Sequence, residues 1–176
     1  MPNDLHAVPP ATLICAVLGG ARQILDEASE RLASCFGPVR RRSETYNFDY
    51  TTYYEPEMDR GLIKQILWFE QSVAPEQLGT VKLQTMAIER ELADTTAGKI
   101  RRRANIDPGL VTVQSLVLAT TKYSGHRICI APGLFAEVTM LFQRDGCRPF
   151  DWTYPDYRSD PVQRFLLEIR QDLLER

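Results

Sequence analysis

Apolar and polar residues occur in blocks along the first half of the chain, and these blocks predict a strand, a helix and two more strands. The continuous apolar run at 12–18 contains β-branched residues and ends at two glycines, which is typical of a buried strand. Apolar residues at helical spacing follow over 21–36, and the glycine and proline that come next predict the end of this helix. The polar but β-compatible segment 39–48 and the strongly apolar segment 62–73 predict two further strands.

A second helix and another strand follow. Pro75 stands at the start of a segment with apolar residues on one stripe, so a helix is predicted from Pro75 to about Thr95. Residues 99–106 predict a strand that ends in a turn at Asn105-Ile-Asp-Pro-Gly109. The resulting order, β-α-β-β-α-β, predicts a ferredoxin-like arrangement.

The C-terminal part of the chain predicts a β-hairpin and a last helix. The segment 110–121 fits a helix and a strand equally well. Residues 126–131 and 134–144 flank Pro132-Gly133 and predict a hairpin around this turn. Ser159-Asp160-Pro161 predicts the start of the final helix.

Together these elements predict a single α+β domain over residues 1–176, with a mostly antiparallel sheet. Residues 12–107 form the expected ferredoxin-like core, and residues 110–176 extend it by the hairpin and the last helix. Residues 1–10 contain three prolines and are expected to be a loose lead-in.

The composition indicates an ordinary globular protein. Of the 176 residues, 44% are hydrophobic and 25% are charged, and the net charge is -2, which argues against disorder and against a dedicated binder of nucleic acid or acidic membranes. The apolar stretch at 11–21 is too short to cross a bilayer and has no basic residues before it, so no membrane association is expected. The four cysteines show no metal-ligand spacing, which predicts reduced thiols and a cytoplasmic location.

The hairpin predicts a pair of residues suited to proton transfer. A two-residue turn at Pro132-Gly133 sets a register that pairs Ile128 with Glu137 and His126 with Thr139. Cross-strand partners share a face, so His126 and Glu137 are expected to lie together as a catalytic acid–base pair. The alternative is a structural His–Glu pair at a sheet edge, which is the commoner use of such a pair.

The helix after Pro75 carries polar residues on its apolar stripe. At 100° per residue Thr85 falls in the middle of the stripe, with Lys82 and Glu89 beside it. Polar groups in this position either line a cavity or extend along the margin of the stripe to reach water. The sequence leaves both alternatives open.

Two further groups of residues are candidates for ligand binding. Arg103, Asn105, Asp107, Lys122 and Arg127 form a candidate substrate-binding set for a phosphate or a carboxylate. The acidic, tyrosine-rich loop at 49–61 contains a candidate metal-binding set with oxygen ligands for Mg²⁺ or Mn²⁺, namely Asp49, Glu55 and Glu57. A solvated loop would have the same composition.

Six segments in a fixed order resemble one protein family. They are Asp49-Tyr-Thr-Thr-Tyr-Tyr-Glu-Pro-Glu-Met58, Arg103-Ala-Asn-Ile-Asp-Pro-Gly109, Leu118-Ala-Thr-Thr-Lys122, His126-Arg-Ile-Cys-Ile130, Ala136-Glu-Val-Thr139 and Trp152-Thr-Tyr-Pro-Asp-Tyr-Arg158. In these segments the chain resembles the bacterial and archaeal family named domain of unknown function 4416. The resemblance implies a cytoplasmic bacterial protein of about this length. Some members carry a "GTP-binding" label, whereas this chain contains no Gly-Lys-Ser/Thr phosphate-binding loop.

These observations lead to two hypotheses of different classes. The first is a small-ligand site for an anionic or phosphorylated compound, nucleotides included, in a metal-assisted or acid–base enzyme. The second is a non-catalytic adaptor domain that binds RNA or forms homo-oligomers. The first predicts convergence on one pocket of Asp49, Arg103, Asn105, Lys122, His126 and Glu137.

Overall fold

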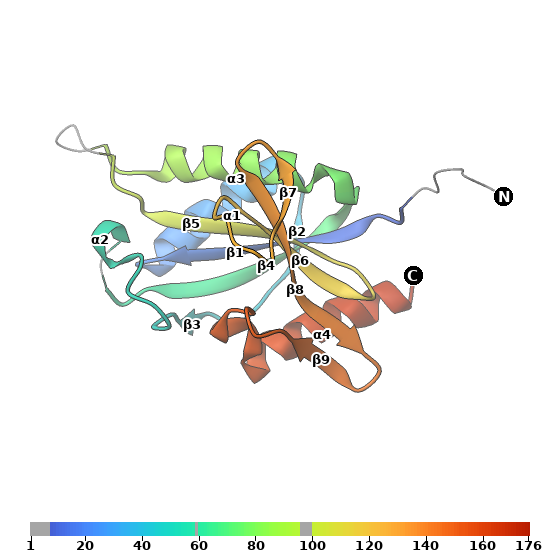
Figure 1. Ribbon diagram of the computed structural model, residues 1–176. Coiled ribbons are helices and arrows are strands. Elements are labelled where there is room, and N and C mark those ends of the chain that lie inside the picture. Colours follow the sequence, from blue (N-terminus) through green and yellow to red (C-terminus); the bar gives the residue numbers. More distant parts are fainter. Residues whose placement is uncertain (1–7, 59, 96–99) are drawn as a thin grey trace.

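The computed structural model describes residues 8–58, 60–95 and 100–176 (Figure 1). These residues form an open antiparallel sheet and four α-helices. The strands are β1 (Ala11–Gly19), β2 (Val39–Arg42), β3 (Tyr46–Asn47), β4 (Ile63–Val73), β5 (Ala104–Val111), β6 (Ser115–Thr120), β7 (Ile128–Ala131), β8 (Leu134–Gln143) and β9 (Gly146–Pro149). The helices are α1 (Arg22–Phe36), α2 (Glu55–Met58), α3 (Leu78–Leu92) and α4 (Asp160–Leu174), with 3₁₀ turns at Pro75–Gln77 and Pro155–Arg158.

The strands lie in the order β2-β4-β1-β5-β6-β8-β7, with β3 paired to β4 and β9 paired to β8. Helices α1 and α3 cover one face of the sheet and α4 covers the other (Figure 1). β1 is buried along its whole length because both of its faces are covered. This double burial explains why β1 has a continuous apolar sequence instead of an alternating one.

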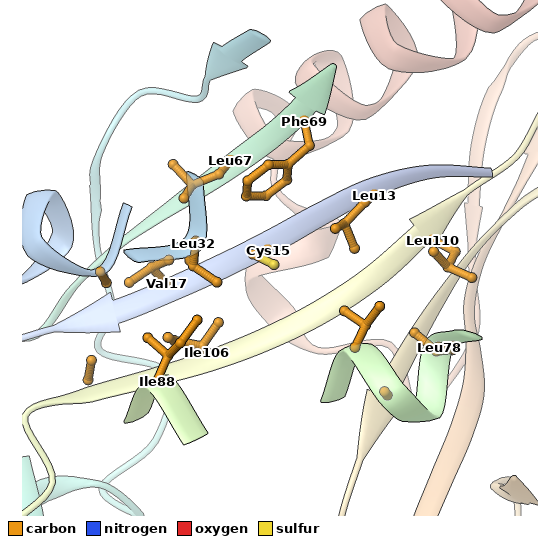
Figure 2. Close-up of a cluster of buried hydrophobic side chains, with 14 of the residues drawn as sticks. Leu13, Cys15, Val17, Leu32, Leu67, Phe69, Leu78, Ile88, Ile106 and Leu110 are labelled. Carbon is orange, nitrogen blue, oxygen red and sulfur yellow. The ribbon is translucent and has the colours of Figure 1, made fainter. Parts of the chain in front are cut away.

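Side chains from the sheet and from two helices fill the core between α1, α3 and the sheet. Leu13, Cys15 and Val17 of β1 point toward this side, and Figure 2 shows them among residues of β4, β5, α1 and α3. A second apolar cluster on the other face joins the sheet to α4. The apolar stripes predicted for the three long helices are therefore the surfaces that pack on the sheet.

Most of the predicted elements are present, with changes at their ends. The predicted strand at 39–48 is divided into β2 and β3, because the Ser43 side chain takes over part of the pairing by accepting a hydrogen bond from the Ile66 backbone N–H at 2.9 Å. The predicted loop at 49–61 contains the short helix α2. Helix α3 starts after one 3₁₀ turn at Pro75 and ends at Leu92, before the predicted end.

The prediction of a turn at residues 105–109 was wrong. These residues lie inside β5, which pairs with β1 from Ala104 to Val111. Of the strand predicted at 99–106, residue 99 lies outside the described residues, and regular strand structure begins at Ala104. The predicted boundary between a core and an extension, at 107–110, therefore falls within a strand.

The C-terminal hairpin is present with a shifted register. Ala131 faces Leu134 as the two-residue turn requires, but a bulge between Cys129 and Ala131 places Ile128 opposite Ala136. The predicted pairing of Ile128 with Glu137 was therefore wrong by one residue. The ambiguous segment 110–121 contains the end of β5 and all of β6, and β9 was not predicted.

The sheet continues past β5 through β6, β8 and β7, so it is larger than the predicted four-stranded core. The α+β class and the mostly antiparallel sheet agree with the prediction. None of the helices formed by the described residues is long and apolar enough to cross a membrane.

Candidate functional site

The sheet opens between β5 and β6. β5 pairs with β1 over its full length, but it pairs with β6 only from Gly109 to Val111. Past this point β6 continues along β8 up to Thr120. One edge of β5 over 104–108 consequently faces no strand among the residues that the structure describes.

Two residues of β5 fix the position of this opening. A Cβ atom on Gly109 would lie 2.5 Å from the Leu118 Cδ2 atom and 3.1 Å from the Val117 carbonyl oxygen, so any larger residue would force the Leu118 side chain and the adjacent part of β6 to move. Backbone N–H and C=O groups of alternate residues point to the same edge of a strand. The backbone of Pro108 therefore faces the opening, as that of Ile106 does. Proline has no N–H to lose at an unpaired edge, which makes its place in this strand physically reasonable.

Side chains of α3 bind the open edge in place of a strand. The Ile106 backbone N–H donates to the Glu89 Oε1 atom at 2.5 Å, and Lys82 Nζ donates to the Ile106 carbonyl at 2.8 Å. Lys82 also lies 3.3 Å from the Asp107 Oδ1 atom and is itself buried. Burial raises the pKa of the Glu89 carboxyl group, and the nearby Lys82 ammonium opposes this effect only in part. The sequence left open whether the polar residues on this stripe line a cavity or extend to water, and the structure shows that Lys82 and Glu89 line a cavity.

The opening forms a cavity of about 400 Å³. Its walls come from α3, β4, β5, β6, β8, the segment 48–54 and the segment 154–157. The charged residues of the wall are Lys64, Lys82, Glu89, Arg102, Asp107, Lys122, Glu137 and Asp156. Four are basic and four are acidic, so the cavity has no formal net charge and its charged groups can pair.

One pair, Lys64 and Asp156, is almost completely removed from water. The Lys64 ammonium is 2.6 Å from the Asp156 Oδ2 atom, and their side chains are 7% and 1% exposed. The Tyr46 hydroxyl donates to the same oxygen at 3.0 Å. Lys64 Nζ also lies about 5 Å from the ring centres of Phe48 and Tyr157, where the aromatic faces stabilise its charge.

Lys122 lies on the exposed side of the cavity. Its ammonium is 3.7 Å from the centre of the Tyr53 ring and 5.8 Å from that of Tyr54. Lys122 makes no ion pair within the described part of the chain. Among the basic groups of the cavity wall, the Lys122 ammonium therefore differs from the others: it faces aromatic rings and has no carboxylate partner among the described residues.

The structure places the predicted acid–base pair together. His126 Nε2 lies 3.2 Å from the Glu137 Oε2 atom, as expected, although the register that predicted this contact was wrong. The same oxygen accepts a 2.7 Å hydrogen bond from Arg127 Nε, and the Glu137 side chain is 1% exposed. His126 stacks on Trp152 with ring centres 5.0 Å apart and is not part of the cavity wall. The guanidinium is thus the closer partner of this buried carboxylate.

The predicted substrate-binding set is only partly brought together. Asn105, Asp107 and Lys122 line the cavity, and Arg127 reaches its edge through a 3.0 Å hydrogen bond to the Tyr154 hydroxyl. Arg103 points elsewhere, toward α1 and α3, where it lies 3.5 Å from a Glu27 carboxylate oxygen and from the Leu92 carbonyl oxygen.

Arg102 occupies the position that the sequence analysis assigned to its neighbour. It donates to the Asn105 Oδ1 atom at 3.0 Å and lies 2.9 Å from a Glu57 carboxylate oxygen. Successive side chains of an extended chain point in opposite directions, so a one-residue difference decides which arginine enters the cavity. The sequence does not give the register of this segment.

The predicted metal-binding set does not come together. Asp49 is exposed and does not line the cavity, while Glu55 pairs with Arg60 at 3.1 Å and Glu57 pairs with Arg102. Across the described ranges, no three His, Cys, Asp or Glu side chains are grouped so that they could hold a metal ion.

Three buried residues of the cavity wall that carry polar groups were not predicted as site residues, namely Lys64, Asp156 and Tyr157. Lys64 and the following glutamine interrupt an otherwise apolar buried strand, and this irregularity is a usable signal. Asp156 and Tyr157 lie in a 3₁₀ turn of an aromatic segment, where polar residues are unremarkable, so no comparable signal marked them.

The comparisons with known proteins give a family and no function. The chain matches no curated protein and no solved structure. The family model described as "Domain of unknown function (DUF4416)" matches residues 9–173, which include every strand, the helices α1 to α3 and all of α4 except its last residue. The chain therefore belongs to the DUF4416 family of domains of unknown function.

Proposed function

We propose that this protein binds a small molecule with an anionic group, a phosphate or a carboxylate, in the cavity between β5 and β6. One observation carries the proposal: regular pairing of β5 is replaced by buried charged side chains around a cavity of about 400 Å³. Buried ion pairs add little stability compared with apolar packing. A ligand site accounts for this arrangement, and the volume lies within the usual range for small-molecule sites.

The anionic part of the ligand is assigned to Lys122. The other basic residues of the cavity wall, Lys64, Lys82 and Arg102, already have carboxylate partners within 3.3 Å. The Lys122 ammonium instead lies over tyrosine rings. A phosphate or carboxylate entering from the exposed side would meet this charge first, and the rings would pack against the rest of the ligand.

A thermal-shift panel of sugar phosphates, nucleotides and short-chain carboxylates, each with and without Mg²⁺, tests the proposal. A compound present at 100 times its Kd adds about 2.7 kcal/mol to stability, which raises the Tm by roughly 5–10 °C for a chain of this size. Lys122→Met should remove most of the shift. Arg144→Met is the matched control, because Arg144 is exposed on the turn between β8 and β9 and is not part of the cavity wall.

A panel without a single stabilising anion would contradict the proposal. A shift that survives Lys122→Met but disappears in Arg144→Met would contradict the assigned site. Equal Tm shifts with and without Mg²⁺ would show that protein groups alone bind the anion. The scattered positions of Asp49, Glu55 and Glu57 favour this result.

Other features of the chain stay predictions under this proposal. The strand order β2-β4-β1-β5, with α1 and α3 on one face, supports a ferredoxin-like unit within the larger sheet. The free cysteines support a reducing, cytoplasmic location. The 3.2 Å contact between His126 and Glu137 supports proton transfer by this pair. The alternative is an RNA-binding or homo-oligomeric adaptor, and helices on both sides of the sheet leave little open sheet surface for RNA.

A further inference from the structure

Two buried polar atoms of residues that line the cavity have no hydrogen-bond partner among the described residues. Six such side-chain atoms occur in the described part of the chain, and the Asp156 Oδ1 atom and the Tyr157 hydroxyl are the two that belong to cavity-lining residues. Asp156 and Tyr157 are 0% and 1% exposed. Buried polar groups in proteins are nearly always paired, so an unpaired one calls for a partner that the protein itself does not contain.

The surroundings of the two atoms indicate which hydrogen bonds each of them can make with a ligand. The other Asp156 oxygen is already occupied by Lys64 and by the Tyr46 hydroxyl, so Oδ1 is left as a pure hydrogen-bond acceptor. The Tyr157 hydroxyl can donate or accept. Burial and the Asp156 carboxylate both raise the pKa of Tyr157 well above its ordinary value, which keeps the hydroxyl protonated and able to donate.

We propose that the ligand carries an amidine-type edge, an amino group beside a ring nitrogen, which donates to the Asp156 Oδ1 atom and accepts from the Tyr157 hydroxyl. This inference rests on the proposed function and names the second half of the same ligand. The aromatic residues of the wall, among them Phe48, Tyr54 and Tyr157, match the flat ring that bears such an edge. The ligand is thus an aminated heteroaromatic compound with an anionic group, and its two ends meet Asp156 and Lys122.

Three probes that differ in one feature at a time test the inference by isothermal titration calorimetry. Adenosine 5′-monophosphate has the amidine-type edge and the phosphate, purine riboside 5′-monophosphate lacks the amino group, and ribose 5-phosphate lacks the ring. The wild-type protein should bind the first at least tenfold more tightly than the second, because a site built around a hydrogen bond rejects a ligand that lacks it.

Two tyrosine variants separate ligand recognition from folding. Tyr157→Phe removes a hydroxyl that has no partner, so the Tm of the free protein should stay level or rise, while the preference for the amino compound falls at least fivefold. The Kd for ribose 5-phosphate should stay within twofold of the wild-type value. Tyr46→Phe is the matched control: it removes a hydroxyl that binds Asp156 outside the cavity wall, so it should lower the Tm and keep the preference.

The outcomes distinguish this inference from the proposed function. Equal affinity for the two purine compounds would overturn the amidine-type edge and leave the anion site standing. A lower Tm for Tyr157→Phe with an unchanged preference would assign the hydroxyl to a buried water and also overturn it. Loss of the amino preference in Tyr46→Phe as well would show a general disturbance and count against the assigned atoms. No binding of the three probes, with stabilisation by another anion of the thermal-shift panel, would overturn the amidine-type edge alone, whereas a panel without a stabilising anion would overturn both proposals.

Discussion

Lys82→Met is expected to destabilise the protein in the absence of any ligand. Methionine keeps the length and apolar stem of the lysine but cannot donate a hydrogen bond. Two interactions disappear with the ammonium: the 2.8 Å hydrogen bond to the Ile106 carbonyl and the 3.3 Å ion pair with Asp107. Glu89 is unchanged and still accepts from the Ile106 N–H, so the substitution tests one half of the side-chain contacts along the open edge.

The structure gives the size of the effect. A buried carbonyl that loses its partner costs about 1–3 kcal/mol. The Asp107 side chain is 31% exposed, so water replaces part of its ion pair and the additional loss is about 1 kcal/mol or less. The sum is about 1–4 kcal/mol, which lowers the Tm by roughly 2–16 °C for a chain of 150–250 residues.

Urea denaturation followed by far-UV circular dichroism measures this change. Lys122→Met is the matched control, since it removes an ammonium from the same cavity that has only tyrosine rings as partners, and it should cost no more than about 1 kcal/mol. A Lys82→Met variant within 0.5 kcal/mol of the wild type, at an equal m value, would refute the reasoning. The open edge of β5 would then be satisfied by water instead of by α3.

Three further predictions concern the same part of the molecule. The pKa of Glu89 is raised in the folded protein, so the protonated carboxyl group stabilises the fold. This contribution is complete below the ordinary pKa of 4.5 and is lost as the pH rises through the raised value. Glu89→Gln should therefore gain stability relative to the wild type as the pH increases from 4 to 8. Gly109→Ala should cost about 1–3 kcal/mol in urea denaturation, because the added methyl group overlaps the neighbouring strand. Arg127→Met should cost about 3–5 kcal/mol and His126→Gln less than about 1 kcal/mol, because the arginine is the closer partner of Glu137 and remains in the second variant.

Each of these predictions has a result that would contradict it. A stability difference between Glu89→Gln and the wild type that does not change with pH would show that Glu89 is not desolvated. Gly125→Ala is the control for Gly109→Ala, because no neighbouring atom lies within 4 Å of the methyl group added at Gly125. An equal loss of stability in both variants would show that the close approach of β6 at Gly109 is not the cause. Equal losses for Arg127→Met and His126→Gln would mean that both side chains support Glu137 to the same extent.

The sequence predicted well those elements that bury a continuous run or a regular stripe of apolar residues. β1, β4 and the long helices have apolar patterns that match how they pack, because each buries one stripe or both of its faces. The error at 105–109 has a physical cause: Asp-Pro-Gly is turn chemistry in most contexts, and only the missing strand partner makes it suitable for β5. An unpaired edge inside a sheet is a tertiary feature that local sequence does not encode.

Some residues of the candidate site could be predicted from the sequence and others could not. Asn105 and Asp107 were identified as polar neighbours of Arg103, and Glu137 was identified from the predicted hairpin as a partner of His126. The choice between Arg102 and Arg103 depends on the register of a short extended segment, which pattern alone does not fix. The contact of His126 with Glu137 was expected from an incorrect register and nevertheless occurs, because both side chains are long enough to meet across the bulge.

The short contact between β5 and β6 has a mechanical consequence. Only Gly109, Leu110 and Val111 join β5 to β6 through strand pairing, so the β2-β4-β1-β5 part and the β6-β8-β7 part are held together mainly by the apolar cluster under α4, which contains residues of both parts. The cavity lies between the two parts, so a ligand that contacts both would connect them on the side where strand pairing is absent.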